Sequence, residues 1–104
     1  MEPQASIRLD KWLWQARFVK SRGLAQRLIA EGAIRVNAVR VVKAATTIRV
    51  GDGLSFAQGG KVRAIRILAL GTRRGPATEA RTLYAEIEAE RGPDALEPVR
   101  ETDR

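Results

Sequence analysis

The 104-residue sequence contains neither cysteine nor histidine. Without cysteine there are no disulfides, thiolate zinc sites or cysteine nucleophiles, and this absence fits a reducing, cytoplasmic location. Without histidine the chain lacks the commonest metal ligand and the usual general base. We therefore expect a protein that is not an enzyme, with no catalytic residues, no metal site and no cofactor.

Long hydrophobic runs are also missing. No apolar stretch approaches the roughly 20 residues that a membrane-spanning helix needs, and residues 1–6 lack the charged start and apolar run of a secretory signal. We expect no membrane partner and interpret residues 1–6 as a flexible leader. The remaining length suits one compact domain, which we expect to be a monomer.

Positive charge is what the chain has in excess, with 19 lysines and arginines against 12 acidic residues. Residues 1–74 carry 15 basic and 4 acidic side chains, a net charge of +11, whereas residues 75–104 carry 4 basic and 8 acidic ones, a net charge of −4. A basic body joined to an acidic segment favours a polyanionic partner such as nucleic acid. The alternative is a solvated basic surface with no partner.

The first third of the sequence has helical periodicity. Apolar residues recur at helical spacing over residues 7–20, with Asp10 as the expected N-cap and Trp12 in the expected core. Ser21 is expected to cap a second helix, and Gly32 to end it. The join between the two helices is so short that they must pack as a tight pair.

From residue 33 onward the hydrophobic period approaches two, which is typical of strands. We expect strands over residues 33–36, 39–42, 46–50, 54–57 and 62–70. Asn37-Ala38 is the expected turn of the first hairpin, and the last strand is expected to carry a bulge or to be buried on both faces. Helical spacing returns over about residues 76–91, and residues 92–104 are expected to be a disordered acidic tail. The predicted fold class is α+β, in one domain over residues 7–91.

The densest group of cations lies in the expected helix pair. Its members are Arg8, Lys11, Arg17, Lys20, Arg22 and Arg27. Unpaired N–H groups and the helix dipole favour an anion at the start of the second helix. Lys20, Ser21 and Arg22 are therefore predicted to form a phosphate site there, although Ser21 taken alone is a simple helix cap.

Two further features are open to two interpretations. Trp14 and Phe18 lie four residues apart, and they either cover a hydrophobic seam or leave a ring free for base stacking. The cations of the expected hairpin, Arg35, Arg40 and Lys43, either protect a strand edge or extend the phosphate-binding track. Spacing alone does not decide either case.

Many spaced positions together resemble the S4 RNA-binding domain, also called the alpha-L motif. They are Arg8-Leu9-Asp10-Lys11-Trp12-Leu13, Lys20-Ser21-Arg22, Ala25, Leu28-Ile29, Gly32, Ile34, Val36-Asn37 and Gly51-Asp52. The resemblance covers about residues 8–56. It implies two packed helices, a small twisted and mostly antiparallel sheet, and a C-terminal helix. The RNA-binding residues that it implies are Arg8, Lys11, Arg17, Lys20, Ser21, Arg22 and Asn37, with Arg40 and Lys43 as weaker transfers, and the cationic group adds Arg27.

A wider resemblance runs from Arg8 to about Glu90 and includes the basic loop Arg73-Arg74-Gly75. It is to the bacterial ribosome-associated fifteen-kilodalton heat-shock proteins. It implies binding of structured ribosomal RNA on the large ribosomal subunit, with or without peptidyl-tRNA, in a stress response that recycles ribosomes. Two features depart from that family: Asn37-Ala38 stands where Asn-Gly is usual, and residues 92–104 are acidic where a longer basic extension is common.

Two other classes of function compete with RNA binding. A short helix–turn–helix can enter a DNA major groove, and the second expected helix offers Arg22, Gln26 and Arg27 on its exposed face. A DNA-binding regulator is therefore the alternative, although no dimerisation element is evident. An attached RNA-modifying catalytic domain does not fit in the remaining length.

Overall fold

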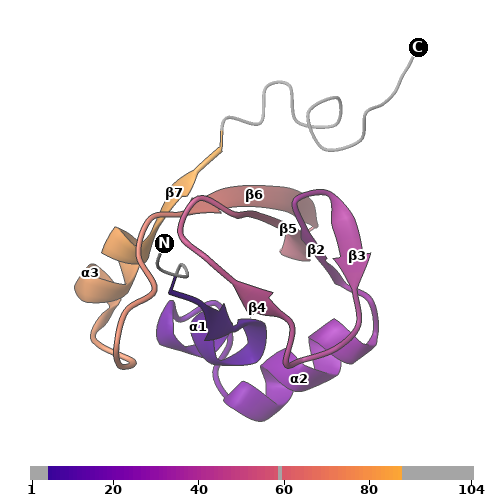
Figure 1. Ribbon diagram of the computed structural model, residues 1–104, viewed down its shortest axis with the longest axis horizontal. Helices are drawn as coiled ribbons and strands as arrows, with labels where there is room; N and C mark the ends of the chain where they lie inside the picture. The colour runs from indigo at the N-terminus through magenta and orange to yellow at the C-terminus, as the bar shows by residue number, and fades with distance from the viewer. Residues whose placement is uncertain (1–4, 59, 88–104) are drawn as a thin grey trace.

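The computed structural model describes residues 5–58 and 60–87 and shows an α+β fold (Figure 1). The helices are α1 (Leu9–Gln15), α2 (Arg22–Ala30), α3 (Ala77–Ala80) and the 3-10 turn η1 (Arg81–Leu83). The strands are β1 (Ile7–Arg8), β2 (Ile34–Val36), β3 (Val39–Val41), β4 (Thr47–Ile48), β5 (Gly53–Gln58), β6 (Lys61–Ile67) and β7 (Tyr84–Glu86). The predicted order of a helix pair followed by strands is confirmed.

The start of α1 differs from the prediction. Arg8 is the N-cap in place of Asp10, and the N–H groups of Leu9 and Asp10 donate to the carbonyls of Thr46 and Ala44. Because the segment before β4 satisfies these first donors, the helix needs no side-chain cap. The carboxylate of Asp10 is instead buried in the first turn.

The end of α1 also differs, because the helix stops at Gln15. Arg17 has a φ of 63° and its N–H donates to the Trp14 carbonyl, while the N–H of Phe18 donates to the Leu13 carbonyl. These bonds form a Schellman motif, which ends a helix. The expected helix is therefore too long at its C-terminal end, and Phe18 lies beyond it.

Helix α2 begins and ends where the sequence predicts. The Ser21 hydroxyl accepts a hydrogen bond from the Leu24 N–H at 3.1 Å. At the other end Gly32 has a φ of 77° and the N–H of Ala33 donates to the Leu28 carbonyl, so a second Schellman motif closes this helix. The short connection holds α1 against α2, as predicted.

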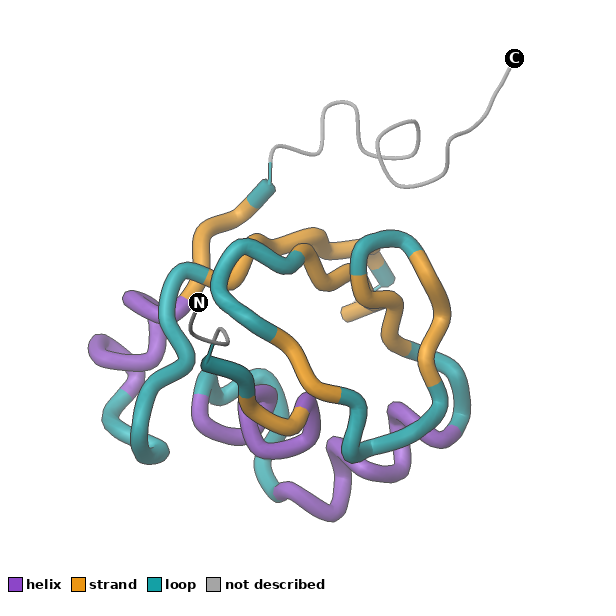
Figure 2. Tube along the Cα trace, in the orientation of Figure 1, coloured by secondary structure: helices purple, strands orange, loops and turns teal. Residues whose placement is uncertain are grey.

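The strands form a five-stranded antiparallel sheet in the order β3-β2-β5-β6-β7, and β1 pairs separately with β4. Figure 2 shows α1 and α2 together on one side of this sheet. Asn37 and Ala38 have φ values of 51° and 72°, as a type I′ hairpin turn requires. In β6 the consecutive residues Ala64 and Ile65 are both buried, which confirms burial on both faces. The pairing with β5 continues without a bulge.

The core lies between the helix pair and the sheet. Trp12 is fully buried there, as predicted, and its Nε1 donates to the Ala69 carbonyl at 3.0 Å. The Phe18 ring packs against Trp12, Phe56 and Tyr84, with centroid distances of 5.9, 5.3 and 4.6 Å. This aromatic cluster joins the end of α1 to the far edge of the sheet.

The predicted helix over residues 76–91 is wrong in much of its described part. α3 and η1 extend only from Ala77 to Leu83, and β7 follows as an edge strand paired with β6. An open sheet edge and the aromatic cluster around Tyr84 outweigh the helical spacing here. Residues 88–91, the acidic tail and residues 1–4 of the leader lie outside the described residues. None of the described helices is long and apolar enough to cross a membrane.

Candidate nucleic-acid interface

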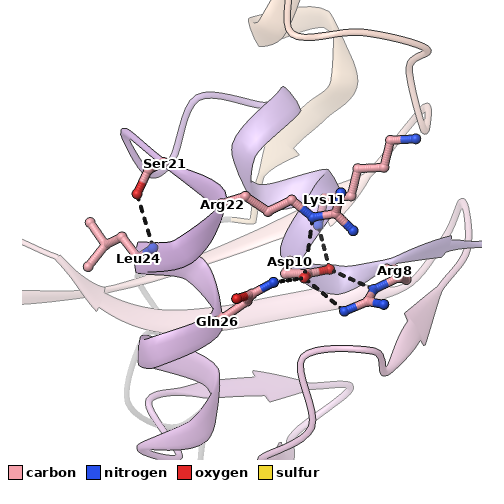
Figure 3. Close-up of polar contacts among 7 residues, drawn as sticks. All are labelled: Arg8, Asp10, Lys11, Ser21, Arg22, Leu24 and Gln26. Atoms are coloured by element: carbon pink, nitrogen blue, oxygen red, sulfur yellow. Dashed lines mark hydrogen bonds and ion pairs between the residues drawn. The ribbon is translucent and has the colours of Figure 1, made fainter.

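A buried carboxylate lies at the centre of the cations on the helix pair. Asp10 has no exposed side-chain surface, and its oxygens accept hydrogen bonds from Arg8 Nε at 3.1 Å and Arg8 Nη2 at 3.0 Å. The Nε2 of Gln26 donates to the same carboxylate at 2.9 Å, and the Nε of Arg22 lies 3.3 Å from Oδ2. Figure 3 shows Arg8 from β1 and both Arg22 and Gln26 from α2 converging on Asp10. We call Arg8, Asp10 and Arg22 the arginine cluster.

Two opposing effects act on the Asp10 carboxyl. Burial raises its pKa, whereas the hydrogen bonds from Arg8 and Gln26 and the contact with Arg22 lower it. The balance leaves the pKa below its ordinary value of 3.8. The carboxylate is therefore ionised at neutral pH and holds both guanidinium groups.

Each of the two arginines contacts Asp10 on one side and is exposed to solvent on the other. The Arg8 side chain is 47% exposed and that of Arg22 is 41% exposed. The buried Nε of Arg22 makes no hydrogen bond within the described part of the chain. Outward-facing guanidinium groups can bind phosphate oxygens in a bidentate manner. The geometry suits an anion at this surface.

The start of α2 is organised differently from the predicted phosphate site. Ser21 uses its hydroxyl as the helix cap, and Figure 3 shows its side chain pointing away from Arg22, which turns toward Asp10. Lys20 is exposed nearby. Ser21 therefore has the simple capping role that its residue type suggests. Arg22 belongs to the arginine cluster.

Three other predicted site residues are exposed cations on the helix pair and its connection. Lys11, Lys20 and Arg27 make no ion pair within residues 5–58 and 60–87. Lys11 follows Asp10 in α1, and Figure 3 shows its side chain extending away from the carboxylate. These side chains add unpaired positive charge to the same helix pair.

Arg17 and Arg74 have structural contacts. The Nε of Arg17 donates to the Gly75 carbonyl at 2.6 Å. The Nη1 of Arg74 donates to the carbonyls of Trp14 and Val19 at 2.8 and 3.0 Å, and its guanidinium lies 5.5 Å from the Trp14 ring centroid. Trp14 is half-buried beneath this contact, which favours packing over base stacking. The sequence identified the basic loop Arg73-Arg74-Gly75 but did not predict that it is hydrogen-bonded to the end of α1 and the segment after it.

The hairpin presents cations, but its asparagine has a structural role. Asn37 Oδ1 accepts from the Gly53 N–H at 2.9 Å and its Nδ2 donates to Asp52 at 3.1 Å. Arg35 and Arg40 are exposed and directly opposite each other in the β2–β3 pairing. Like charges in such a pair repel, and neither has an acidic partner within the described ranges.

The remaining hairpin positions differ in how well they are placed. The aliphatic stem of Arg40 packs against Gly32, where an added Cβ would lie 3.0 Å from its Cδ. Lys43 is exposed on the segment that leads to β4. Arg40 is thus fixed over the end of α2, while Lys43 has no such support among the described contacts.

The alternative function, a DNA-binding regulator, was expected to use Arg22, Gln26 and Arg27, and one of these three side chains is engaged elsewhere. The Gln26 amide donates to Asp10, so it is engaged within the helix pair and is not free to read a base edge. The residues that the structure describes contain no group of three or more acidic, cysteine or histidine side chains placed to hold a metal ion.

Comparison with known proteins identifies a family and several relatives. The S4 domain family matches residues 7–54. A heat shock protein 15 homolog of Haemophilus influenzae is 41% identical over 86 residues, which cover 83% of this chain and 65% of the relative. Heat shock protein 15 of Escherichia coli is 39% identical over 85 residues, which cover 82% of this chain and 63% of the relative. The chain therefore spans less than two thirds of the length of these two relatives.

Two other relatives are covered more completely. The "RQC P-site tRNA stabilizing factor" of Listeria innocua is 34% identical over 83 residues, covering 78% of this chain and 89% of that protein. A structure of Vibrio cholerae heat shock protein 15, described as trimeric, superimposes with a TM-score of 0.75 at 36% identity and covers 80% of this chain and 83% of that one. On these matches and the shared architecture, the chain belongs to the S4 domain family.

Proposed function

We propose that this protein binds structured ribosomal RNA through the helix pair and the β2–β3 hairpin. The observation that carries the proposal is the arginine cluster, in which a buried carboxylate holds two half-exposed guanidinium groups outward. The names of the relatives support the choice of RNA, because they include a factor that stabilises P-site tRNA. The proposed role is association with the large ribosomal subunit during ribosome recycling under heat shock.

The proposed contacts are mainly electrostatic. Phosphate oxygens would bind the outer edges of Arg8 and Arg22, and exposed Lys11, Lys20 and Arg27 would neutralise neighbouring phosphates. On the hairpin, Arg35 and Arg40 would take a further phosphate, which would relieve their mutual repulsion. Lys43 would extend the track. Arg17, Ser21 and Asn37 would shape the surface, since their polar groups already have partners within the chain.

A charge-matched pair of variants tests the surface. We expect Lys11→Gln combined with Arg27→Gln to weaken binding to an in vitro transcribed large-subunit ribosomal RNA by about tenfold or more. The slope of log K against log salt concentration should become shallower by about 2, since each lost phosphate contact contributes about 0.9. Filter binding or fluorescence anisotropy at several KCl concentrations measures both quantities.

The control carries the same change of charge elsewhere. Lys61→Gln combined with Arg81→Gln removes one lysine and one arginine from exposed positions on β6 and η1. This control should bind nearly as the wild-type protein does. Equal loss in both double variants would mean that net charge alone drives binding, and the proposed surface would be wrong.

The ribosomal role needs a separate measurement. Sucrose-gradient fractionation of cell extract, with detection of this protein, should place it with free large subunits. Sedimentation at the top of the gradient, or with small subunits alone, would contradict the proposed association.

We further propose that the protein acts as a monomer. Fourteen of the sixteen buried apolar side chains of the described residues form one cluster around the helix pair and sheet, so the fold needs no partner to complete its core. The Vibrio cholerae relative is described as trimeric, which makes this proposal worth testing directly. Sedimentation equilibrium should give a mass near 11.5 kDa, and a mass about three times larger would contradict it.

A further inference from the structure

An acidic residue at the centre of a phosphate-binding surface needs an explanation. The negative charge of Asp10 opposes any phosphate that approaches Arg8 or Arg22. Burying that charge also costs free energy. Asp10 nevertheless has no exposed side-chain surface and lies within 3.3 Å of both guanidinium groups.

We propose that Asp10 is a positioning residue, which holds Arg8 and Arg22 in the conformations that bind phosphate. The inference rests on the proposed RNA-binding function and deepens it. Long arginine side chains lose conformational freedom when they bind a ligand, at a cost of about 0.5–1.5 kcal/mol for each side chain. Asp10 imposes that order before the RNA arrives.

The hydrogen bonds to Asp10 leave several N–H donors of both arginines available to a phosphate. Arg8 gives its Nε and one Nη2 donor to Asp10, so three of its five N–H donors stay available. Arg22 approaches the carboxylate with its Nε alone, so both of its terminal amino groups stay available. Each arginine thus keeps an outer edge that suits a phosphate.

Two further hydrogen bonds to the Asp10 carboxylate hold it in place. The backbone N–H of Lys11 donates to Oδ1 at 2.8 Å, and the Gln26 amide donates to Oδ2 at 2.9 Å. These bonds fix the carboxylate relative to both α1 and α2 (Figure 3). The positions of the two arginines are therefore tied to the packing of the helix pair.

Removal of the carboxylate charge separates positioning from simple electrostatics. Asp10→Asn raises the net charge of the protein by one unit from +7, which on electrostatic grounds alone should strengthen RNA binding. If Asp10 positions the arginines, the same change should weaken binding of large-subunit ribosomal RNA by about tenfold.

Glu31→Gln is the matched control. Glu31 is exposed at the end of α2 and forms no ion pair within residues 5–58 and 60–87. This variant gains the same charge and should bind with unchanged or slightly higher affinity. If Asp10→Asn is folded and binds as tightly as Glu31→Gln, the positioning role is overturned.

A measurement on the wild-type protein covers the case in which Asp10→Asn does not fold. The ¹⁵N–¹H heteronuclear NOE of the arginine Nε groups should be high for Arg8 and Arg22 and low for Arg27. Equal mobility of all three side chains would overturn the inference. Absence of RNA binding by the wild-type protein would instead overturn the proposed function itself.

Discussion

Arg74 shows how this chain uses a cation to close a helix. Its guanidinium donates to the Trp14 carbonyl in the last turn of α1 and to the Val19 carbonyl in the connection that follows, and it stacks on the Trp14 ring. Positive charge at a helix C-terminus is favourable because the last carbonyls carry partial negative charge. Arg17, just after the end of α1, adds a hydrogen bond to the Gly75 carbonyl. These two arginines stabilise the fold, while the arginine cluster faces solvent.

Substitution of Arg74 tests this structural role. Arg74→Lys keeps the charge but loses the planar stacking and the fixed geometry of two hydrogen bonds. We expect the free energy of unfolding to fall by about 1–3 kcal/mol, measured by urea denaturation followed by circular dichroism.

Arg73→Lys provides the comparison, because Arg73 is exposed and pairs only with Glu79 among the described contacts. Exposed ion pairs contribute little to stability, so the urea midpoint of Arg73→Lys should stay close to that of the wild-type protein. Equal effects of the two substitutions would show that Arg74 has no special role in closing α1.

The pKa of Asp10 leads to a prediction about acid. A carboxyl whose pKa is lowered on folding contributes stability above its ordinary, unfolded-state pKa of 3.8 and loses it as the pH falls through the folded-state value. The unfolding free energy of the wild-type protein should therefore exceed that of Asp10→Asn at pH 7. Urea denaturation from pH 7 to about pH 2.5 should show this difference shrinking below about pH 4. A difference that stays constant over this range would contradict the ionised, hydrogen-bonded state of Asp10.

Among the elements, the β2–β3 turn carries visible strain. Ala38 has a φ of 72°, which an L-residue with a Cβ adopts at a cost of about 1 kcal/mol. Ala38→Gly should therefore raise the unfolding free energy by about 0.5–1 kcal/mol, because glycine adopts this conformation freely. Thermal denaturation monitored by circular dichroism gives the measurement.

Ala57→Gly serves as the control for that substitution. Ala57 is an exposed residue inside β5, where glycine destabilises a strand by about 0.5–1 kcal/mol. The two substitutions should act in opposite directions. If both substitutions destabilise the protein, Ala38 is not strained in the turn and the prediction is wrong.

The elements that the sequence predicted well carry local signals with a clear mechanism. Ser21 caps α2, Gly32 ends it, and Asn37-Ala38 turns the hairpin, each through its own backbone or side-chain chemistry. The family resemblance placed the same elements in the correct order. These features depend on a few neighbouring residues, so sequence patterns identify them.

The wrong predictions have two physical causes, a missing local signal and contacts with distant residues. α1 ends at a left-handed residue that is an arginine, Arg17, so the usual glycine signal is absent. Tyr84 and its neighbours have helical spacing but pair with β6, an interaction with residues far away in the chain. Asp10 looks like a cap, and its bond to Gln26 spans 16 residues. Helical periodicity contains none of this tertiary information.

At the scale of the whole molecule, the part that the structure describes presents positive charge because most of the acidic side chains in that part are engaged. Four of the five acidic side chains within residues 5–58 and 60–87 have hydrogen-bond or ion-pair partners: Asp10 with two arginines, Asp52 with Asn37 and the Arg49 N–H, Glu79 with Arg73, and Glu86 with Arg63. Cations without such partners therefore dominate the surface of the helix pair and hairpin. A field of this kind attracts polyanions and depends on salt.

The most direct test of the central claim compares RNA with DNA under the same conditions. The affinity of the wild-type protein for large-subunit ribosomal RNA should fall steeply as KCl rises from about 50 to 200 mM. At each salt concentration it should remain well above the affinity for duplex DNA of equal length. Equal affinity for the two would reduce the protein to a general polyanion binder, and tighter binding of one DNA sequence would favour a DNA-binding regulator and contradict the account.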